Sequence, residues 1–104
     1  MNEELRSRWQ EWERLPYPTS QHPPGSEVAG VDLALTDGDA AAIFHQFFDS
    51  GDLPHGLEHL DAVLSDLGLA LPELRGMSRT YFGGAVALLR AIRAQLTPRS
   101  IHEA

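Results

Sequence analysis

The residues from 78 to 96 constrain the fold of this 104-residue chain more than any other segment. In a helix, which turns by about 100° per residue, they form two uncharged faces on opposite sides. The large apolar face contains Phe82, Ala85, Leu89, Ile92 and Leu96, and the small-residue stripe contains Thr80, Gly84, Ala87, Ala91 and Ala94. A helix that is uncharged on two opposed sides is normally buried on both. We therefore expect this helix to lie at the centre of the fold.

Two adjacent glycines lie inside this helix. A glycine costs about 1 kcal/mol relative to alanine in a helix interior, so Gly83 and Gly84 are predicted to permit the close approach of another backbone. We expect the N-terminal segment, with Trp9 and Trp12, and the segment over residues 31–35 to cover the small-residue stripe. The alternative is a second copy of the chain, related by two-fold symmetry.

Three further helices are predicted by apolar periodicity and by end signals. The first covers residues 3–15, with Leu5, Trp9 and Trp12 on one narrow stripe. The second runs from cap signals at Thr36 and Asp37 to about residue 49, after an extended run over residues 31–35. The third opens at residues 52–54 and closes at Gly68, and the last helix is capped by Ser78. Fifteen leucines and twelve alanines also favour helices over strands.

Residues 16–26 contain four prolines and form either an extended linker or a tightly laid loop. The predicted fold is therefore all-α, in a single domain over residues 1–104. It consists of a small bundle of three core helices within residues 27–97, plus an N-terminal amphipathic helix within residues 1–15 that the proline-rich segment joins to it.

Charge is divided sharply along the chain. No lysine or arginine occurs between Arg14 and Arg75, and ten of the fifteen carboxylates lie in that interval. Three arginines, Arg79, Arg90 and Arg93, follow on one flank of the last helix. We expect them to pair with carboxylates of the acidic middle. Exposed pairs contribute only about 0–1 kcal/mol each and are screened by salt.

Composition excludes several classes of function. The chain has no cysteine, hence no disulfide framework, thiolate metal site or thiol nucleophile. Its formal net charge of −7 argues against nucleic-acid binding. Its apolar runs fall far short of the roughly 20 residues of a membrane span, and its N-terminus lacks a secretory signal. We expect a cytoplasmic protein that needs no cofactor and binds neither nucleic acid nor membrane.

Residues 55–59 match the H-x-x-E-H pattern of the inverted zinc peptidases. Two observations argue against a peptidase. After His59 only Glu73 and Glu103 remain as further glutamate ligands, and neither belongs to a second motif. On the helical wheel, both histidines of the pattern lie opposite the leucine face, in water rather than in a shielded cleft.

A simpler metal site is the alternative hypothesis. His45 and Asp49 are one turn apart on the second predicted helix, and His55 and His59 are one turn apart on the third. A tight hairpin would bring these four ligands close together, and imidazole with carboxylate suits a divalent first-row metal. We favour no metal, and expect these histidines to be solvent-exposed side chains without structural partners.

The preferred interpretation is a non-enzymatic, acidic interaction or regulatory protein. An inhibitor or immunity-type protein that presents its carboxylates to a basic partner would have this composition. The residues expected to mediate interaction are Trp9, Trp12, Arg79, Arg90 and Arg93. The partner is either another protein or a second copy in a homodimer, and an amphipathic helix can dock on its own bundle or in a partner's groove.

Overall fold

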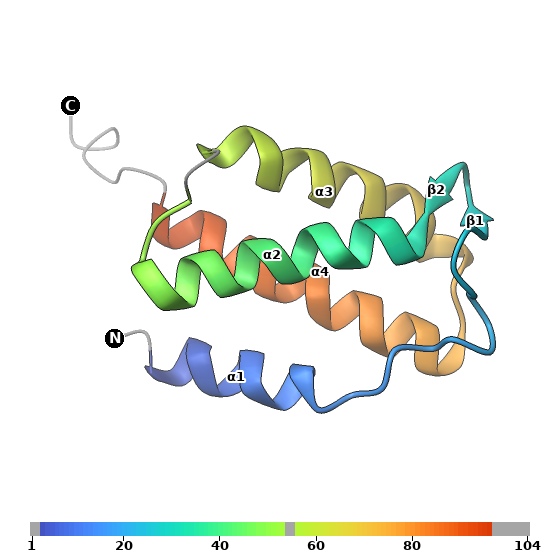
Figure 1. Cartoon of the computed structure of the whole chain (residues 1–104), viewed down its shortest axis with the longest axis horizontal. Coiled ribbons are helices and arrows are strands. Elements are labelled where there is room, and N and C mark those ends of the chain that lie inside the picture. The colour runs from blue at the N-terminus through green and yellow to red at the C-terminus, as the bar shows by residue number, and fades with distance from the viewer. Residues whose placement is uncertain (1–2, 54–55, 97–104) are drawn as a thin grey trace.

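Four helices pack together in a computed structural model that describes residues 3–53 and 56–96. They are α1 (Glu3–Glu13), α2 (Leu33–Ser50), α3 (Gly56–Ala70) and α4 (Gly76–Leu96). A short 3-10 turn, η1 (Leu71–Glu73), joins α3 to α4. The all-α fold expected from the sequence is confirmed (Figure 1). Within the described ranges, no helix is long and apolar enough to cross a membrane.

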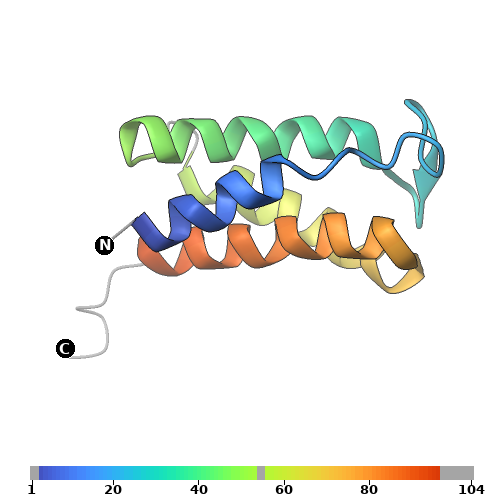
Figure 2. The same cartoon turned by 90° about the horizontal axis from the view of Figure 1, so that it is seen from below.

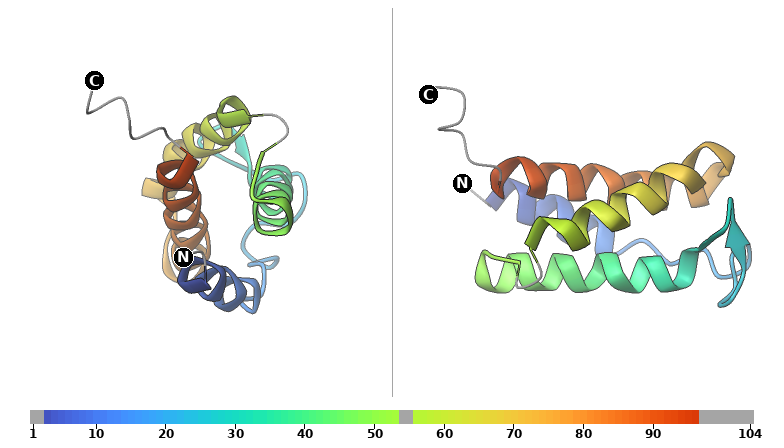
Figure 3. Two further views of the ribbon diagram at one scale, coloured as in Figure 1. Left: turned by 90° about the vertical axis from the view of Figure 1, so that its left-hand side faces the viewer. Right: turned by 90° about the horizontal axis from the view of Figure 1, so that it is seen from above.

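The helices occupy the corners of a bundle when the molecule is viewed along its length (Figure 3). Both α1 and α3 lie beside α4, and α2 lies beside α3 on the other side of the bundle. Figure 2 shows α1 crossing the space between α2 and α4 at one side of the molecule. The helix α4 contacts all three other helices, but it occupies a corner, so the prediction that it lies at the centre and is buried on both faces is wrong for its outer face.

The helix α2 begins at Leu33, earlier than predicted. The carboxylate of Asp32 accepts a hydrogen bond from the backbone N–H of Leu35 at 3.1 Å, which makes Asp32 the N-cap. The predicted extended run over residues 31–35 is therefore wrong beyond Asp32. At the other end, Gly51 adopts the left-handed conformation that ends a helix, with φ 81°, as the sequence indicated.

The boundaries of the last two helices also differ from the prediction. Gly68 does not end α3, which continues to Ala70 and passes into η1. The helix α4 begins at Gly76, whose φ of 60° suits glycine. Ser78 is not its cap, because this buried side chain instead donates a hydrogen bond to the side-chain oxygen of Gln21.

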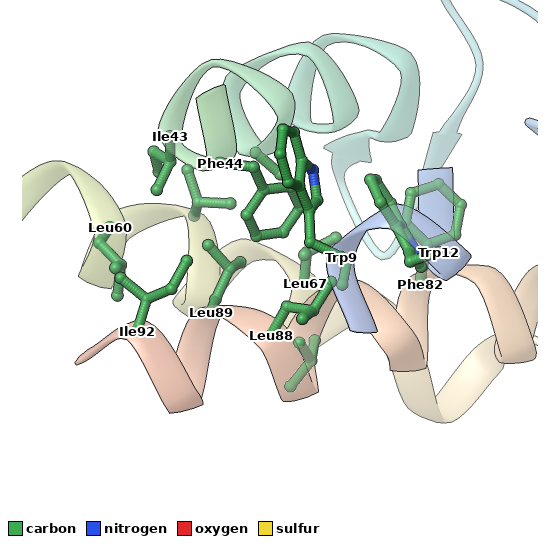
Figure 4. Packing of buried hydrophobic residues seen from close by; sticks show 14 of the residues in the cluster. Trp9, Trp12, Ile43, Phe44, Leu60, Leu67, Phe82, Leu88, Leu89 and Ile92 are labelled. Carbon is green, nitrogen blue, oxygen red and sulfur yellow. The ribbon is translucent and has the colours of Figure 1, made fainter. Parts of the chain in front are cut away.

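Apolar side chains from all four helices meet in one core (Figure 4). Phe44, Leu60, Leu67, Leu89 and Ile92 are almost completely buried there. The helix α1 docks on this core through two tryptophans, since Trp9 stacks on Phe48 with ring centroids 4.6 Å apart and Trp12 meets Phe44 edge-on at 5.1 Å. The N-terminal helix therefore packs on its own bundle.

The proline-rich segment is a tightly laid loop rather than an extended linker. Tyr17 contacts the rings of Tyr81 and Phe82, and its hydroxyl donates to the carbonyl of His22 at 3.0 Å. A small antiparallel hairpin follows, formed by β1 (Glu27–Val28) and β2 (Val31–Asp32), which the sequence did not predict. Its turn contains Ala29 and Gly30, both with positive φ. Alanine is an unusual residue at such a position, so the turn carries little sequence signal.

Candidate interaction groove

The contact between α1 and α4 depends on one glycine. A side chain at Gly84 would place its Cβ 2.8 Å from Cδ1 of Trp12, so only glycine admits the indole. The indole N–H of Trp12 donates to the carbonyl of Tyr81 at 2.8 Å, which satisfies a buried donor. The expected close approach is confirmed at Gly84, although it involves a ring rather than a backbone. Gly83 has open space where its side chain would be, so the same explanation is wrong for Gly83.

The helix α1 covers only part of the small-residue stripe. Gly84 and Ala91 are half-buried, whereas Thr80, Ala87 and Ala94 are exposed. The prediction that the whole stripe is covered is therefore wrong. The physical reason is that α1 has only eleven residues and presents the wide Trp12 indole at a single level of the stripe.

Two hollows run along this partly covered seam. One, of about 380 Å³, is lined by Arg8, Glu11, Trp12, Leu15, Thr80, Gly84, Ala87 and Leu88. The other, of about 370 Å³, is lined by Leu15, Pro16, Gly76, Met77, Thr80 and Tyr81. They share Leu15 and Thr80, so they lie next to each other along the seam, and we call the pair the α1/α4 groove.

Two large apolar side chains stand exposed toward one end of this groove, Leu15 where the two hollows meet and Met77 beyond it. Leu15 retains 40% of its exposure and Met77 retains 64%. Sequence analysis missed both residues, although a signal was present. Leu15 lies off the tryptophan stripe, and Met77 lies about a quarter turn from the large apolar face of its helix. Both line the same hollow, which distinguishes them from Leu35 and Leu69, exposed elsewhere.

The floor of the groove is fixed by a polar contact on its inner side. The hydroxyl of Tyr81 donates to the carboxylate of Asp37 on α2 at 2.7 Å. Burial raises the pKa of Asp37 above its ordinary value, and the hydrogen bond from Tyr81 offsets part of that rise. Burial and the nearby carboxylate also raise the pKa of the Tyr81 phenol, which stays protonated and keeps donating. This bond ties α4 to α2 behind the groove.

The three arginines of α4 differ in their surroundings. Arg93 pairs with Asp61 of α3, with Nε 2.7 Å and Nη2 3.1 Å from the carboxylate oxygens, and this hydrogen bond lowers the pKa of Asp61. Arg79 donates instead to the carbonyl of Leu71 at 3.4 Å. Arg90 is exposed, and within residues 3–53 and 56–96 neither it nor Arg79 forms an ion pair. The predicted pairing with the acidic middle is confirmed for Arg93 and wrong for the other two.

The four residues of the alternative metal site are not brought together. His45 lies 3.5 Å from the carboxylate of Glu13 and contacts the ring of Trp9, so it faces α1. His59 lines a separate open hollow between α2 and α3, with Ala42, Gln46 and Glu58. The prediction that the histidines have no structural partners is wrong for both, since His59 also interacts within the chain.

His55 lies outside the described residues, and Asp49 is exposed at the end of α2. Over the described ranges, no three histidine, aspartate or glutamate side chains converge well enough to hold a metal ion. The packing of α3 against α2 places His45 and His59 on different sides of α2. Helical spacing alone therefore predicted a cluster of ligands that does not form.

Comparison with known proteins found no family model that matches the chain, and no significantly similar curated protein or solved structure. The α1/α4 groove is therefore interpreted from its own geometry.

Proposed function

We propose that this chain is a non-enzymatic protein-binding module that accepts a segment of a partner protein in the α1/α4 groove. The observation that carries the proposal is a pair of adjacent hollows along a helix face that α1 leaves half covered. Small residues of α4 line the groove, and the exposed Leu15 and Met77 lie toward one end of it. Exposed apolar surface beside a groove is typical of interaction sites.

The shape of the groove favours a helix as the bound segment. Small exposed side chains at Thr80 and Ala87 let a second helix approach α4 closely, while α1 forms one wall. Amphipathic helices bind in such grooves through apolar residues at helical spacing. The polar groups at the groove, including Arg8 and Glu11, lie at its rim, where they select a partner rather than perform chemistry.

This proposal changes the role expected for the tryptophans. Trp9 and Trp12 retain only 6% and 8% of their exposure, so they hold α1 in position instead of contacting a partner directly. Trp12 still lines the groove, where it fixes the distance between the two walls. The partner-facing residues on this account are Leu15, Met77 and Ala87.

The experiment uses the absence of cysteine from the chain. An Ala87→Cys variant carries a single thiol in the groove, which can be labelled with a benzophenone photo-crosslinker. Ala62→Cys places the same label at an exposed alanine of α3, away from the groove. In extracts of the native cell, we expect a discrete cross-linked protein from position 87 and none from position 62.

The cross-linked partner is then purified and its dissociation constant is measured. Ala87→Gln should weaken binding, while the matched Ala62→Gln should leave it unchanged. Equal cross-linking from both positions, or equal binding by both glutamine variants, would contradict the proposal. A cross-link between two copies of the chain would identify a homodimer that uses this groove.

A further inference from the structure

The division of charge along the chain becomes a division between faces of the bundle. The helix α4 carries three arginines and no carboxylate, whereas residues 33–70, which include α2 and α3, carry no lysine or arginine. In the end-on view, the outer side of α4 faces away from α2 (Figure 3). The α4 side of the groove thus belongs to a helix with a positive net charge, in a protein whose net charge is −7.

Arg79 and Arg90 do not line the groove, but both lie on the flank of α4 that follows the small-residue stripe on the side away from α1. At 100° per residue, both lie on the same flank of α4, roughly a quarter turn from the stripe that contains Thr80 and Ala87. Both side chains are exposed, and Arg93 points instead toward Asp61 of α3. Arg8 adds a third guanidinium on the α1 wall. A helix bound over the stripe would therefore have Arg8 and Glu11 on its α1 side and Arg79 and Arg90 on its other side.

A second copy of the chain is a poor match for this surface. Two-fold pairing through the outer side of α4 would bring Arg79 and Arg90 of both copies into one interface, and α4 supplies no carboxylate to compensate them. Among the described residues that line the groove, Glu11 is the one carboxylate. Like charges brought together in an interface weaken association, so the charges favour an acidic partner.

The spacing of the arginines defines a pattern in the partner. Arg79 and Arg90 are eleven residues apart, which corresponds to about 16 Å along a helix axis at 1.5 Å per residue. That span is close to three helical turns, so carboxylates about three turns apart on a parallel or antiparallel helix would face both arginines. The exposed Leu15 and Met77 at one end would contact a large apolar residue.

We propose that the occupant of the α1/α4 groove is an amphipathic helix of a partner protein that carries acidic residues about three turns apart beside its apolar face. This inference rests on the proposed function and specifies the chemistry of the partner. It reverses the direction of recognition expected from composition, because the partner presents the acids and this chain presents the arginines.

The test is a selection from a displayed library of amphipathic helices of about 18 residues, a length at which helices become stable. The library keeps a fixed Leu/Ala face and randomises the flanking positions among Glu, Lys, Ser and Gln. The unaltered protein should enrich helices with glutamates about three turns apart. The variant Arg79→Glu/Arg90→Glu should enrich lysines at the same positions.

A peptide from the enriched pool then serves as the probe for binding measurements. Arg79→Gln/Arg90→Gln should weaken its affinity by about tenfold, and the loss should shrink in high salt. The control Ala62→Glu/Ser65→Glu changes the net charge by the same amount on exposed positions of α3, and its affinity should equal that of the parent. Circular dichroism confirms that each variant is folded.

Two results would overturn the inference while leaving the proposed function in place. One is enrichment of helices with neutral or basic flanks whose binding is lost in Ala87→Gln. The other is self-association of the parent in sedimentation experiments that Arg79→Glu/Arg90→Glu abolishes, which would make a second copy the occupant. If no enriched helix loses binding in Ala87→Gln, the groove is not the binding site and the proposed function fails as well.

Discussion

The seam between α3 and α4 is closed, whereas the seam between α1 and α4 is half open, although both involve the same helix. On the α3 side, Leu60 and Leu67 meet Leu89 and Ile92, and all four are almost fully buried. On the α1 side, Trp12 covers Gly84, but Thr80 and Ala87 beside it remain exposed. Large side chains on both partners close a seam. Small residues facing a short helix leave a groove.

The largest expected effect is the difference in unfolding free energy between a variant in the closed core and variants at the groove. Phe44→Ala removes a fully buried ring at the centre of the bundle and should destabilise the fold by about 3–5 kcal/mol. Leu15→Ala and Met77→Ala alter exposed side chains and should change stability by no more than about 0.5 kcal/mol. Urea unfolding of the three variants checks the comparison. A comparable loss for Leu15→Ala would mean that the groove end is part of the core.

The two adjacent glycines of α4 should respond in opposite ways to substitution by alanine. Gly84→Ala places a methyl group against the Trp12 ring, and such overpacking typically costs about 1–3 kcal/mol, which outweighs the gain in helix propensity. Gly83→Ala meets open space and should stabilise the helix by about 0.5–1 kcal/mol. Thermal unfolding of the two variants should therefore shift in opposite directions. Equal shifts would show that Trp12 does not pack on Gly84.

A pH experiment tests the bond between α2 and α4. Because burial raises the pKa of Asp37, the folded state keeps this proton at pH values where the unfolded chain, with an ordinary value of 3.8, has lost it. The contribution of Asp37 to stability therefore falls as pH rises from about 4 through the raised pKa. Asp37→Asn removes that dependence, so its stability relative to the parent should improve between pH 4 and pH 7.

Unfolding free energies at the two pH values provide the measurement. Tyr81→Phe is the companion variant, since it removes the hydrogen bond and leaves the carboxylate in place. A constant difference between Asp37→Asn and the parent across this range would show that the carboxylate is fully solvated.

The smallest expected effect concerns the arginines of α4. Arg93→Gln breaks the exposed pair with Asp61 and should lower stability slightly, and by less in high salt. Arg90→Gln removes a charge without an ion pair in the described part of the chain and should leave stability within about 0.5 kcal/mol. Urea unfolding at low and high salt distinguishes them. A larger loss for Arg90→Gln would contradict the view that this arginine is held available for a partner.

The helices and the buried apolar face of α4 were predictable because apolar periodicity reports directly on burial. The close approach at Gly84 was also predictable, because glycine destabilises a helix interior and is expected where a neighbouring group leaves no room for a side chain. The start of α2 was not, because Asp32, Thr36 and Asp37 are all competent caps and tertiary packing decides among them. Thr36 is in fact buried, so it belongs to the core rather than to the helix end.

The groove was only partly predictable. Its small-residue floor was evident from the sequence, but the extent to which α1 covers that floor depends on the angle and length of α1. Charge pairing failed for a related reason. Arg79, Arg90 and Arg93 share a flank, yet only Arg93 lies where α3 presents a carboxylate. Periodicity indicates which residues share a face, and packing decides which neighbour that face meets.

The position of the two tryptophans gives the molecule a built-in optical reporter. Both lie in α1, one stacked on Phe48 and the other bonded to α4 at the edge of the groove. Intrinsic fluorescence therefore reports the attachment of one helix, while far-ultraviolet circular dichroism is dominated by the other three. If α1 detaches before the rest unfolds, the emission maximum will move to longer wavelength at lower urea than the loss of ellipticity. The same emission would register occupation of the groove without any label.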